Sequence, residues 1–266
     1  MAMLKVKDLG ISFGGLAAVN NFELEIGTNE LVGLIGPNGA GKTTVFNMLT
    51  GVYEPGIGKI EMEGGKLNGL KTWQIARRHV ARTFQNIRLF KDMPVIDNVK
   101  IGCNTLYQYS LLDAVFHTKR YKEAEKTMEA EAERLLKLFH LEDKAEQNAS
   151  ALAYGEQRRL EIARALALKP KLLLLDEPAA GMNPQETVEL AEMIRWIKEE
   201  FQISILLIEH DMKLVMNVCD RVVVLCFGEI IADGRPEEIQ NNEKVLEAYI
   251  GKKRCVKKKE ALYAET

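Results

Sequence analysis

A glycine-rich segment between an apolar run and a helical pattern constrains this chain more than any other feature. Residues 36–43 read Gly-Pro-Asn-Gly-Ala-Gly-Lys-Thr and match the pattern G-x-x-x-x-G-K-[S/T]. The apolar run 31–35 precedes them, and residues 43–49 carry apolar side chains at helical spacing. Such a loop lets backbone N–H groups surround a phosphate, and the helix that follows points its positive end at it. The order of strand, loop and helix therefore predicts a phosphate-binding loop in an α/β fold.

The loop assigns a role to each of its polar side chains. Lys42 is placed to reach the β- and γ-phosphates of a nucleotide, and the Thr43 hydroxyl can bind Mg²⁺. The candidate nucleotide-binding residues of this segment are Gly36, Pro37, Asn38, Gly39, Ala40, Gly41, Lys42, Thr43 and Thr44. A glycine turn that binds nothing is disfavoured by its position between a buried strand and a helix.

A second apolar run, residues 172–175, ends in two carboxylates, Asp176 and Glu177. A buried strand that ends this way places Asp176 where it can hold Mg²⁺ or its water. Glu177 can then polarise the water that attacks the γ-phosphate. The run alone is equally typical of a strand that ends at the surface, so the phosphate loop is what makes it a candidate catalytic element.

The order of the remaining segments indicates a parallel α/β core with an insertion. Strand-like segments occupy residues 4–6, 22–26, 31–35, 59–63 and 80–84, and later 172–175, 203–208 and 222–227. Residues 120–141 and 186–200 have the apolar spacing of amphipathic helices. Strands that alternate with helices favour a parallel sheet. Residues 88–160 are predicted to form a helical insertion between two strand-bearing parts.

Composition excludes several classes of protein. The 266 residues carry 36 Lys+Arg against 38 Asp+Glu, and a net charge of −2 gives no overall field that would gather nucleic acid. No apolar stretch approaches the roughly 20 residues that a membrane-spanning helix needs. The four cysteines include no C-x-x-C pair, which predicts reduced thiols rather than a disulfide framework or a zinc site.

Together these motifs resemble the ATP-binding subunit of an ABC transporter. The resemblance implies a P-loop NTPase (RecA-like) core that is mostly parallel, an N-terminal antiparallel β region and a helical subdomain, within an ATPase domain of residues 1–251. It implies that Phe13 stacks on adenine and that His210 contacts the γ-phosphate. It also implies that Gln85 senses Mg²⁺ and water and links the site to a membrane partner.

Two segments depart from the family pattern. The signature is usually L-S-G-G-Q, whereas this chain has Leu-Ala-Tyr-Gly-Glu-Gln at residues 152–157. The signature residues, which act on the ATP of a partner subunit, would be Ala153, Tyr154, Gly155, Glu156 and Gln157. Ala153 lacks the serine hydroxyl, and a missing charge-assisted hydrogen bond costs on the order of 1.5–3 kcal/mol. Asn183 stands where the family's D-loop more often has aspartate, so it keeps an acceptor but no charge.

The same segments resemble those of branched-chain amino-acid importers. They comprise L-A-Y-G with the following residues 158–164, the run 176–184, and residues 206–216. The resemblance implies ATP and Mg²⁺ as cofactors, and a dimer with a copy or a sister subunit. It further implies transmembrane permease subunits, an indirect extracytoplasmic solute-binding protein, no nucleic-acid partner, and a cytoplasmic place on the inner face of the membrane.

Other functions are also compatible with parts of this sequence. An importer ATPase could serve another small solute, such as an amide or urea. A soluble ABC ATPase acting on ribosomes or DNA would share every motif, although such proteins usually have two nucleotide domains or a long coiled-coil arm. A kinase or GTPase would lack the signature and His210, and a non-hydrolysing regulator would not need Glu177. Residues 252–266 carry a net charge of +4, which indicates a solvated basic tail or a contact with anionic lipid.

Overall fold

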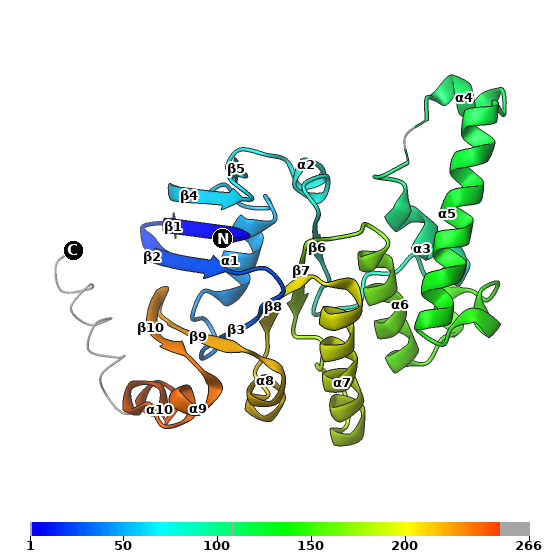
Figure 1. Cartoon of the computed structure of the whole chain (residues 1–266). Coiled ribbons are helices and arrows are strands. Elements are labelled where there is room, and N and C mark those ends of the chain that lie inside the picture. Colours follow the sequence, from blue (N-terminus) through cyan, green and yellow to red (C-terminus); the bar gives the residue numbers. More distant parts are fainter. Residues whose placement is uncertain (1, 108, 251–266) are drawn as a thin grey trace. The chain divides into compact units, whose positions relative to one another are not determined.

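The computed structural model describes residues 2–107 and 109–250, and the chain divides into two compact units. Unit 1 comprises residues 1–75 and 174–266, and unit 2 comprises residues 76–173. The basic tail predicted at 252–266 lies outside the described residues. Figure 1 shows the order of the elements along the chain.

The core of unit 1 is a buried sheet made from the apolar runs of the sequence. Its strands are β3 (Leu31–Ile35), β7 (Leu172–Asp176), β8 (Ser204–Ile208), β9 (Arg221–Cys226) and β10 (Glu229–Gly234), in the order β10-β9-β3-β8-β7. β3 pairs in parallel with both β8 and β9, whereas β10 is an antiparallel edge strand. Every residue of β3, β7 and β8 is buried, as expected for parallel strands covered on both faces. The predicted parallel α/β core is confirmed.

An antiparallel sheet forms the N-terminal part of unit 1, in the order β2-β1-β4-β5. Its strands are β1 (Leu4–Phe13), β2 (Leu16–Ile26), β4 (Ile57–Met62) and β5 (Gly65–Lys66). β1 and β2 are longer than the predicted segments 4–6 and 22–26. Asp8 and Asn21 have positive φ, and the β1–β2 register shifts after Val6. Such bulges interrupt the alternation of apolar side chains, which is why the sequence pattern shows only part of each strand.

The helices of unit 1 follow the strands. They are α1 (Lys42–Leu49), α7 (Pro184–Phe201), α8 (Met212–Val218), α9 (Pro236–Gln240) and α10 (Glu243–Ile250), and α2 (Thr72–Ala76) ends one residue into unit 2. α7 packs against α8, and α9 packs against β9 and β10. The sequence predicts α1 and α7 to within two residues at each end.

Unit 2 is mainly helical. After β6 (Val80–Arg82) come α3 (Val95–Cys103), α4 (Leu111–Val115), α5 (Lys119–Leu138), the short turns η1 (Glu142–Lys144) and η2 (Ala149–Ala151), and α6 (Tyr154–Leu166). α3 packs on both α5 and α6 (Figure 1). α5 ends earlier than the predicted residue 141, because His140 takes the left-handed conformation that terminates a helix. In the part of the chain that the structure describes, no helix is both long enough and apolar enough to cross a membrane.

Two cysteines are protected by their place in the fold. Cys103 at the end of α3 and Cys219 after α8 are both buried, in different units. Burial raises the pKa of the Cys103 thiol to about 11 and raises the pKa of Cys219 as well. Because only the thiolate reacts with alkylating reagents, both residues are chemically inert in the folded chain.

We therefore expect iodoacetamide at about pH 8 to leave Cys103 and Cys219 unmodified in the native protein. At that pH roughly one Cys103 thiol in a thousand is ionised, given its pKa of about 11. Peptide mass spectrometry before and after denaturation measures the modification. Rapid native labelling of either residue, at the rate seen after unfolding, would contradict the buried placement.

Candidate functional site

The phosphate loop lies between β3 and α1, and its backbone is held tightly by neighbouring strands. Gly36 has a φ of 152°, and a Cβ there would overlap the carbonyl oxygen of Leu225 in β9. Gly41 has a φ of 107°, and its Cβ would lie 2.7 Å from the Ala18 carbonyl oxygen in β2. Only glycine satisfies both the conformation and the space at these two positions. The motif glycines are therefore required by packing as well as by phosphate geometry.

Lys42 begins α1 and turns back over the loop. Its Nζ donates to the carbonyl oxygens of Gly36 at 2.7 Å and Pro37 at 3.1 Å. Burial lowers the pKa of Lys42, and the charges of Glu177 and Asp176 oppose that shift. An ammonium group held by neutral carbonyls and facing two carboxylates is well placed to exchange those carbonyls for phosphate oxygens.

The rest of the loop is open. Asn38, Gly39 and Thr43 are exposed, and no atom of the described residues lies within 4 Å of the position that a Cβ of Gly39 would take. The loop is also braced from the far side, where the Gly228 amide donates to the Ala40 carbonyl at 2.8 Å. A fixed backbone with an open outer face fits a bound polyphosphate.

Asp176, Glu177 and His210 meet at the carboxyl ends of β7 and β8. Asp176 is the buried last residue of β7, and the Glu177 amide donates to the Ile208 carbonyl at 2.9 Å. The Glu177 carboxylate lies 3.6 Å from Nδ1 of His210, whose ring is largely exposed. The three residues are predicted from separate sequence motifs, and they lie at neighbouring strand ends in the structure. The side chain of Glu177 is partly exposed to solvent.

Glu209 is a residue of this site that sequence reasoning missed. It is fully buried, and its carboxylate accepts from the Ala179 amide at 2.7 Å and from the His210 amide at 3.0 Å. Burial raises its pKa, and these hydrogen bonds oppose the rise. Glu209 therefore joins the turn after Glu177 to the start of the His210 segment. The available signal was an acidic residue directly after the buried run of β8.

Phe13 lies at the end of β1, in the same unit. Its ring packs edge-on against Tyr53 with centroids 5.2 Å apart, and both residues remain partly exposed. A half-exposed aromatic pair can stack on a planar ring, and the adenine-stacking role of Phe13 stays a prediction.

Asn183 has a structural role that its sequence position does not reveal. Its side chain caps α7 by accepting from the amides of Gln185 at 2.9 Å and Glu186 at 3.0 Å. The Glu186 carboxylate in turn accepts a hydrogen bond from the Asn183 amide, which completes a capping box. An aspartate would serve equally well as a cap, so the cap does not explain why asparagine stands here.

The signature segment forms the start of α6 in unit 2. Ala153 precedes the helix, and Glu156 turns back to accept from the Ala153 amide at 3.2 Å. Lys144 binds the same carboxylate at 2.6 Å and is the main cause of the lowered pKa of Glu156. Gln157 donates to the Leu152 carbonyl, and among the described residues no atom lies within 4 Å of where a Cβ of Gly155 would be. Glu156 therefore binds the Ala153 amide, whereas Ala153 has no side-chain oxygen to accept from the amides of the first turn of α6.

A buried ion pair joins α6 to the loop that carries Gln85. Arg158 and Glu161 are both 1% exposed and lie 2.7 Å apart. Arg158 donates to the carbonyls of Phe84 at 2.8 Å and Gln85 at 3.0 Å. Glu161 accepts from the amides of Phe84 at 3.4 Å and Arg88 at 3.1 Å. The exposed Gln85 side chain thus stands on a backbone that is fixed by two side chains of the signature helix.

This pair also explains a difference from the sequence prediction. The strand predicted at 80–84 is only Val80–Arg82, because the backbone groups of Phe84 and Gln85 bind side chains of α6 rather than a neighbouring strand.

The residues present fit a nucleotide with Mg²⁺. The described residues contain no group of three or more His, Cys, Asp or Glu that could hold a metal alone. Asp176 and Thr43 would supply two oxygen ligands, and a Mg²⁺ ion commonly takes its other ligands from phosphates and water. The crowded glycines and the carbonyl-bound Lys42 provide the matching phosphate cradle.

Comparison with protein families agrees with this geometry. Residues 19–180 match the family described as ABC transporter, and residues 229–253 match the one described as branched-chain amino acid ATP-binding cassette transporter. Among solved structures, the chain is similar to the ADP conformation of MJ1267, an ATP-binding cassette of an ABC transporter. The TM-score is 0.82 at 29% identity, covering 95% of this chain and 100% of that one. The predicted fold class is confirmed.

Curated relatives are similar over almost their whole length. The high-affinity branched-chain amino acid transport ATP-binding protein LivG of Escherichia coli K12 is 48% identical over 249 residues, which cover 94% of this chain and 98% of LivG. BraF of Pseudomonas aeruginosa, which has the same description, is 45% identical with the same coverage. The lipopolysaccharide export system ATP-binding protein LptB of Escherichia coli K12 is 34% identical, covering 94% of this chain and 98% of LptB.

The buried pair of unit 2 leads to a stability prediction. Arg158→Met leaves the Glu161 charge buried without its partner, and we expect a loss of about 3–5 kcal/mol in the free energy of unfolding. The double variant Arg158→Met/Glu161→Met buries no unpaired charge and should lose less than the single variant. Urea unfolding of the full chain measures both.

Arg159→Met is the matched control, because Arg159 is partly exposed and lies 3.7 Å from Glu156. Its loss should stay below about 1 kcal/mol. The single variant Glu161→Met completes the set, and a double variant as unstable as the sum of the two single variants would show that the two side chains do not act as a pair.

Proposed function

The chain belongs to the ABC transporter family, and from that membership we propose that it hydrolyses ATP to drive an importer of branched-chain amino acids. The observation that carries the proposal is the group at the ends of β7 and β8. Glu177 lies 3.6 Å from His210, and Lys42 faces Glu177 and Asp176 from the phosphate loop. These residues match the acid–base and charge requirements of phosphoryl transfer to water.

Each side chain has a distinct role in this proposal. Lys42 and the loop amides bind the β- and γ-phosphates, and Phe13 stacks on the adenine. Thr43, Asp176 and Gln85 would hold Mg²⁺, which when bound neutralises charge on the phosphates. Glu177 accepts a proton from the attacking water, and His210 donates a hydrogen bond to the γ-phosphate.

The proposal places the signature segment on a second ATPase subunit. Ala153, Tyr154, Gly155, Glu156 and Gln157 act on the partner's ATP through the backbone amides and the positive end of α6. The partner is a copy of this chain or a sister subunit. Gln85 carries the movement to a transmembrane permease at the inner face of the membrane, and an extracytoplasmic binding protein delivers the solute.

The choice of solute is supported by the relatives. LivG and BraF, both described as branched-chain amino acid transport proteins, are more similar to this chain than LptB is. Residues 229–253 add a match to a family model of the same description. An amide or urea importer is the nearest alternative, since the solute is chosen by the binding protein and the permease.

A single substitution tests the hydrolytic role. Glu177→Gln removes the proton acceptor and keeps the size of the side chain, so we expect ATP turnover to fall about a hundredfold or more. The same variant should accumulate an ATP-bound dimer, detectable by size-exclusion chromatography. Glu192→Gln, an exposed carboxylate on α7, is the control and should hydrolyse ATP as the parent does. Normal turnover by Glu177→Gln would refute the assignment of the base.

A reconstitution experiment tests the transport role. The chain is assembled with a permease and a binding protein of a branched-chain amino acid importer, and ATP hydrolysis is measured in proteoliposomes. We expect leucine-, isoleucine- or valine-loaded binding protein to stimulate hydrolysis, because loaded binding protein favours the closed dimer. Stimulation by an amide or urea alone would replace the proposed solute while leaving the ATPase assignment intact.

A further inference from the structure

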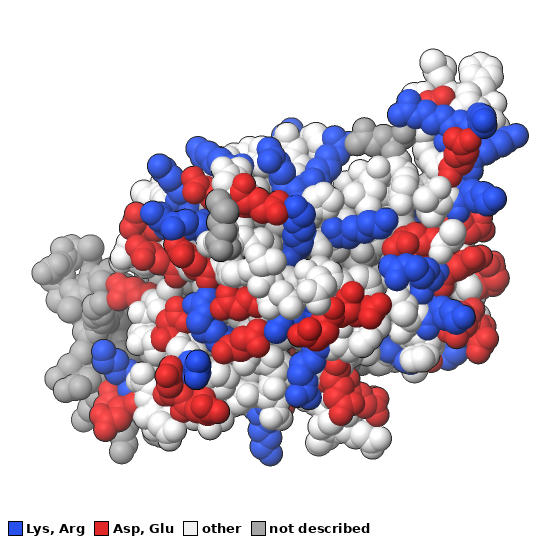
Figure 2. Space-filling model, in the orientation of Figure 1, with Lys and Arg blue, Asp and Glu red and all other residues white. Residues whose placement is uncertain are grey.

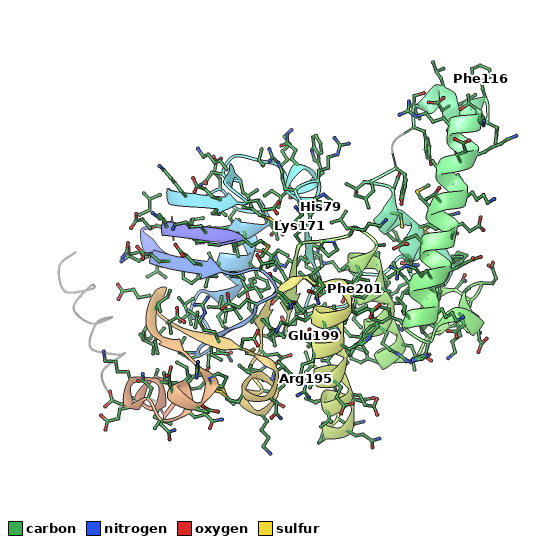
Figure 3. The ribbon with its side chains drawn as sticks, viewed as in Figure 1. His79, Phe116, Lys171, Arg195, Glu199 and Phe201 are labelled. Atoms are coloured by element: carbon green, nitrogen blue, oxygen red, sulfur yellow. The ribbon has the colours of Figure 1, made fainter. Side chains whose placement is uncertain are left out.

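The most exposed large apolar residues of the described chain lie together at one end of unit 2. Leu111, Leu112, Val115 and Phe116 are 86%, 68%, 68% and 73% exposed. We call these four residues the apolar tip. They belong to α4 and its C-cap, and the side chain of Phe116 points outward at the end of this segment (Figure 3). A cluster of this kind marks an interaction surface, whereas single exposed apolar residues do not.

The apolar tip is one face of a helix. Residues at positions 111, 112, 115 and 116 lie within about 140° of one another at 100° per residue. Asp113 lies on the other side, where its carboxylate accepts from Ser110 and from Thr118 Oγ1 at 2.9 Å. The polar groups of the segment are thus satisfied locally, and the apolar face is left to solvent.

The junction between α4 and α5 gives this face a defined shape. Ser110 and Asp113 form a capping box at the start of α4, and Thr118 caps α5. Between the helices, His117 has a φ of 47°, the left-handed conformation that ends a helix. The apolar tip therefore belongs to a short helix that is capped at its start by Ser110 and terminated after Phe116 by His117.

Aromatic rings pack next to the apolar tip, at the start of α5. Tyr121 of α5 packs edge-on against both His117, at 5.4 Å, and Tyr109, at 5.0 Å. The Tyr109 hydroxyl donates to Glu125 at 2.9 Å, and Lys100 of α3 pairs with the same carboxylate at 3.3 Å. These contacts connect the tip to α3 and α5 and hold it in place.

Basic residues flank the apolar tip. Lys119, Arg120 and Lys122, on the first turn of α5, are exposed. Figure 2 shows blue side chains beside the white end of this segment. Glu123 lies 3.8 Å from Lys119, but both side chains are solvent-exposed, and such a pair contributes little and can separate. With Asp113 and Glu123 included, residues 110–123 carry a net charge of +1.

We propose that the apolar tip inserts into the interface of an anionic membrane, with Lys119, Arg120 and Lys122 at the level of the lipid phosphates. An exposed apolar face bordered by lysine and arginine is the pattern of interfacial membrane binding. A stable protein interface commonly buries about 20–30 residues a side, far more than four side chains on a short helix supply. Charge complementarity and the size of the face therefore favour a lipid surface. This role is separate from ATP hydrolysis.

Vesicle flotation with the full chain tests the proposal. We expect binding to phosphatidylcholine vesicles that contain phosphatidylglycerol, weaker binding to phosphatidylcholine alone, and loss of binding at high salt. Leu111→Ser/Phe116→Ser should weaken binding to the anionic vesicles roughly tenfold or more. Arg120→Glu should weaken it roughly fivefold or more. Every variant keeps the basic tail, so the differences report on the tip.

Two matched controls lie on α7. Val188→Ser removes an exposed apolar side chain, and Arg195→Glu makes the same change of charge at a residue remote in sequence (Figure 3). Both should bind vesicles as the parent does. All variants should keep the parent's unfolding midpoint, since the substituted side chains are exposed.

Insertion depth gives an independent readout. In Phe116→Trp, lipids with brominated acyl chains should quench more tryptophan emission than in the parent, which has Trp73 and Trp196 only. Vesicle binding that is absent in the parent, or unchanged in the tip variants, would overturn the proposal. It would also be overturned if the tip variants lost assembly with the permease in detergent while vesicle binding stayed normal, because the tip would then bind protein.

Discussion

The contact between the phosphate loop and the strands beside it is the constraint on which the site depends. Gly36 fits against the carbonyl of Leu225, and Gly41 fits against the carbonyl of Ala18, where a larger residue would overlap or strain the backbone. The Gly228 amide holds the loop through Ala40. The loop amides are therefore fixed by β2, β9 and the turn after β9 before any ligand arrives. A preorganised set of donors loses little freedom on binding, which favours tight capture of phosphate.

A second constraint acts on the positions of Glu177 and His210. Burying a carboxylate is unfavourable, yet Glu209 is fully buried, and two backbone amides compensate for part of that cost. The two bonds tie the turn after Glu177 to the backbone of His210. The 3.6 Å separation of Glu177 and His210 thus depends on a third acidic residue that lies behind them. Removing it would disturb the pair without touching either member.

The sequence predicts those parts of the fold whose signals are local. The loop motif, the apolar runs of β3, β7 and β8, and the carboxylates after β7 can each be recognised within a few residues. Arg158 and Glu161 could not be recognised, because two charges three residues apart on a helix usually mark a solvated face. Their burial depends on Phe84 and Gln85, more than seventy residues away. The apolar tip was missed for the opposite reason, since four large apolar residues beside a charged helix usually belong to a buried core.

The division of the chain into two units gives the Arg158–Glu161 pair a wider consequence. The phosphate loop, Asp176, Glu177, Glu209 and His210 all belong to unit 1, whereas the Gln85 loop and the signature segment both belong to unit 2. Within unit 2, the pair binds the backbone of the Gln85 loop to the helix that begins at the signature. Separating Arg158 from Glu161 would leave a buried charge without its partner, so the pair resists small displacements. Any displacement of α6 therefore carries the Gln85 loop with it as one body. Gln85 and residues 153–157, which we propose act on the metal and on the partner's nucleotide, then move as a single part.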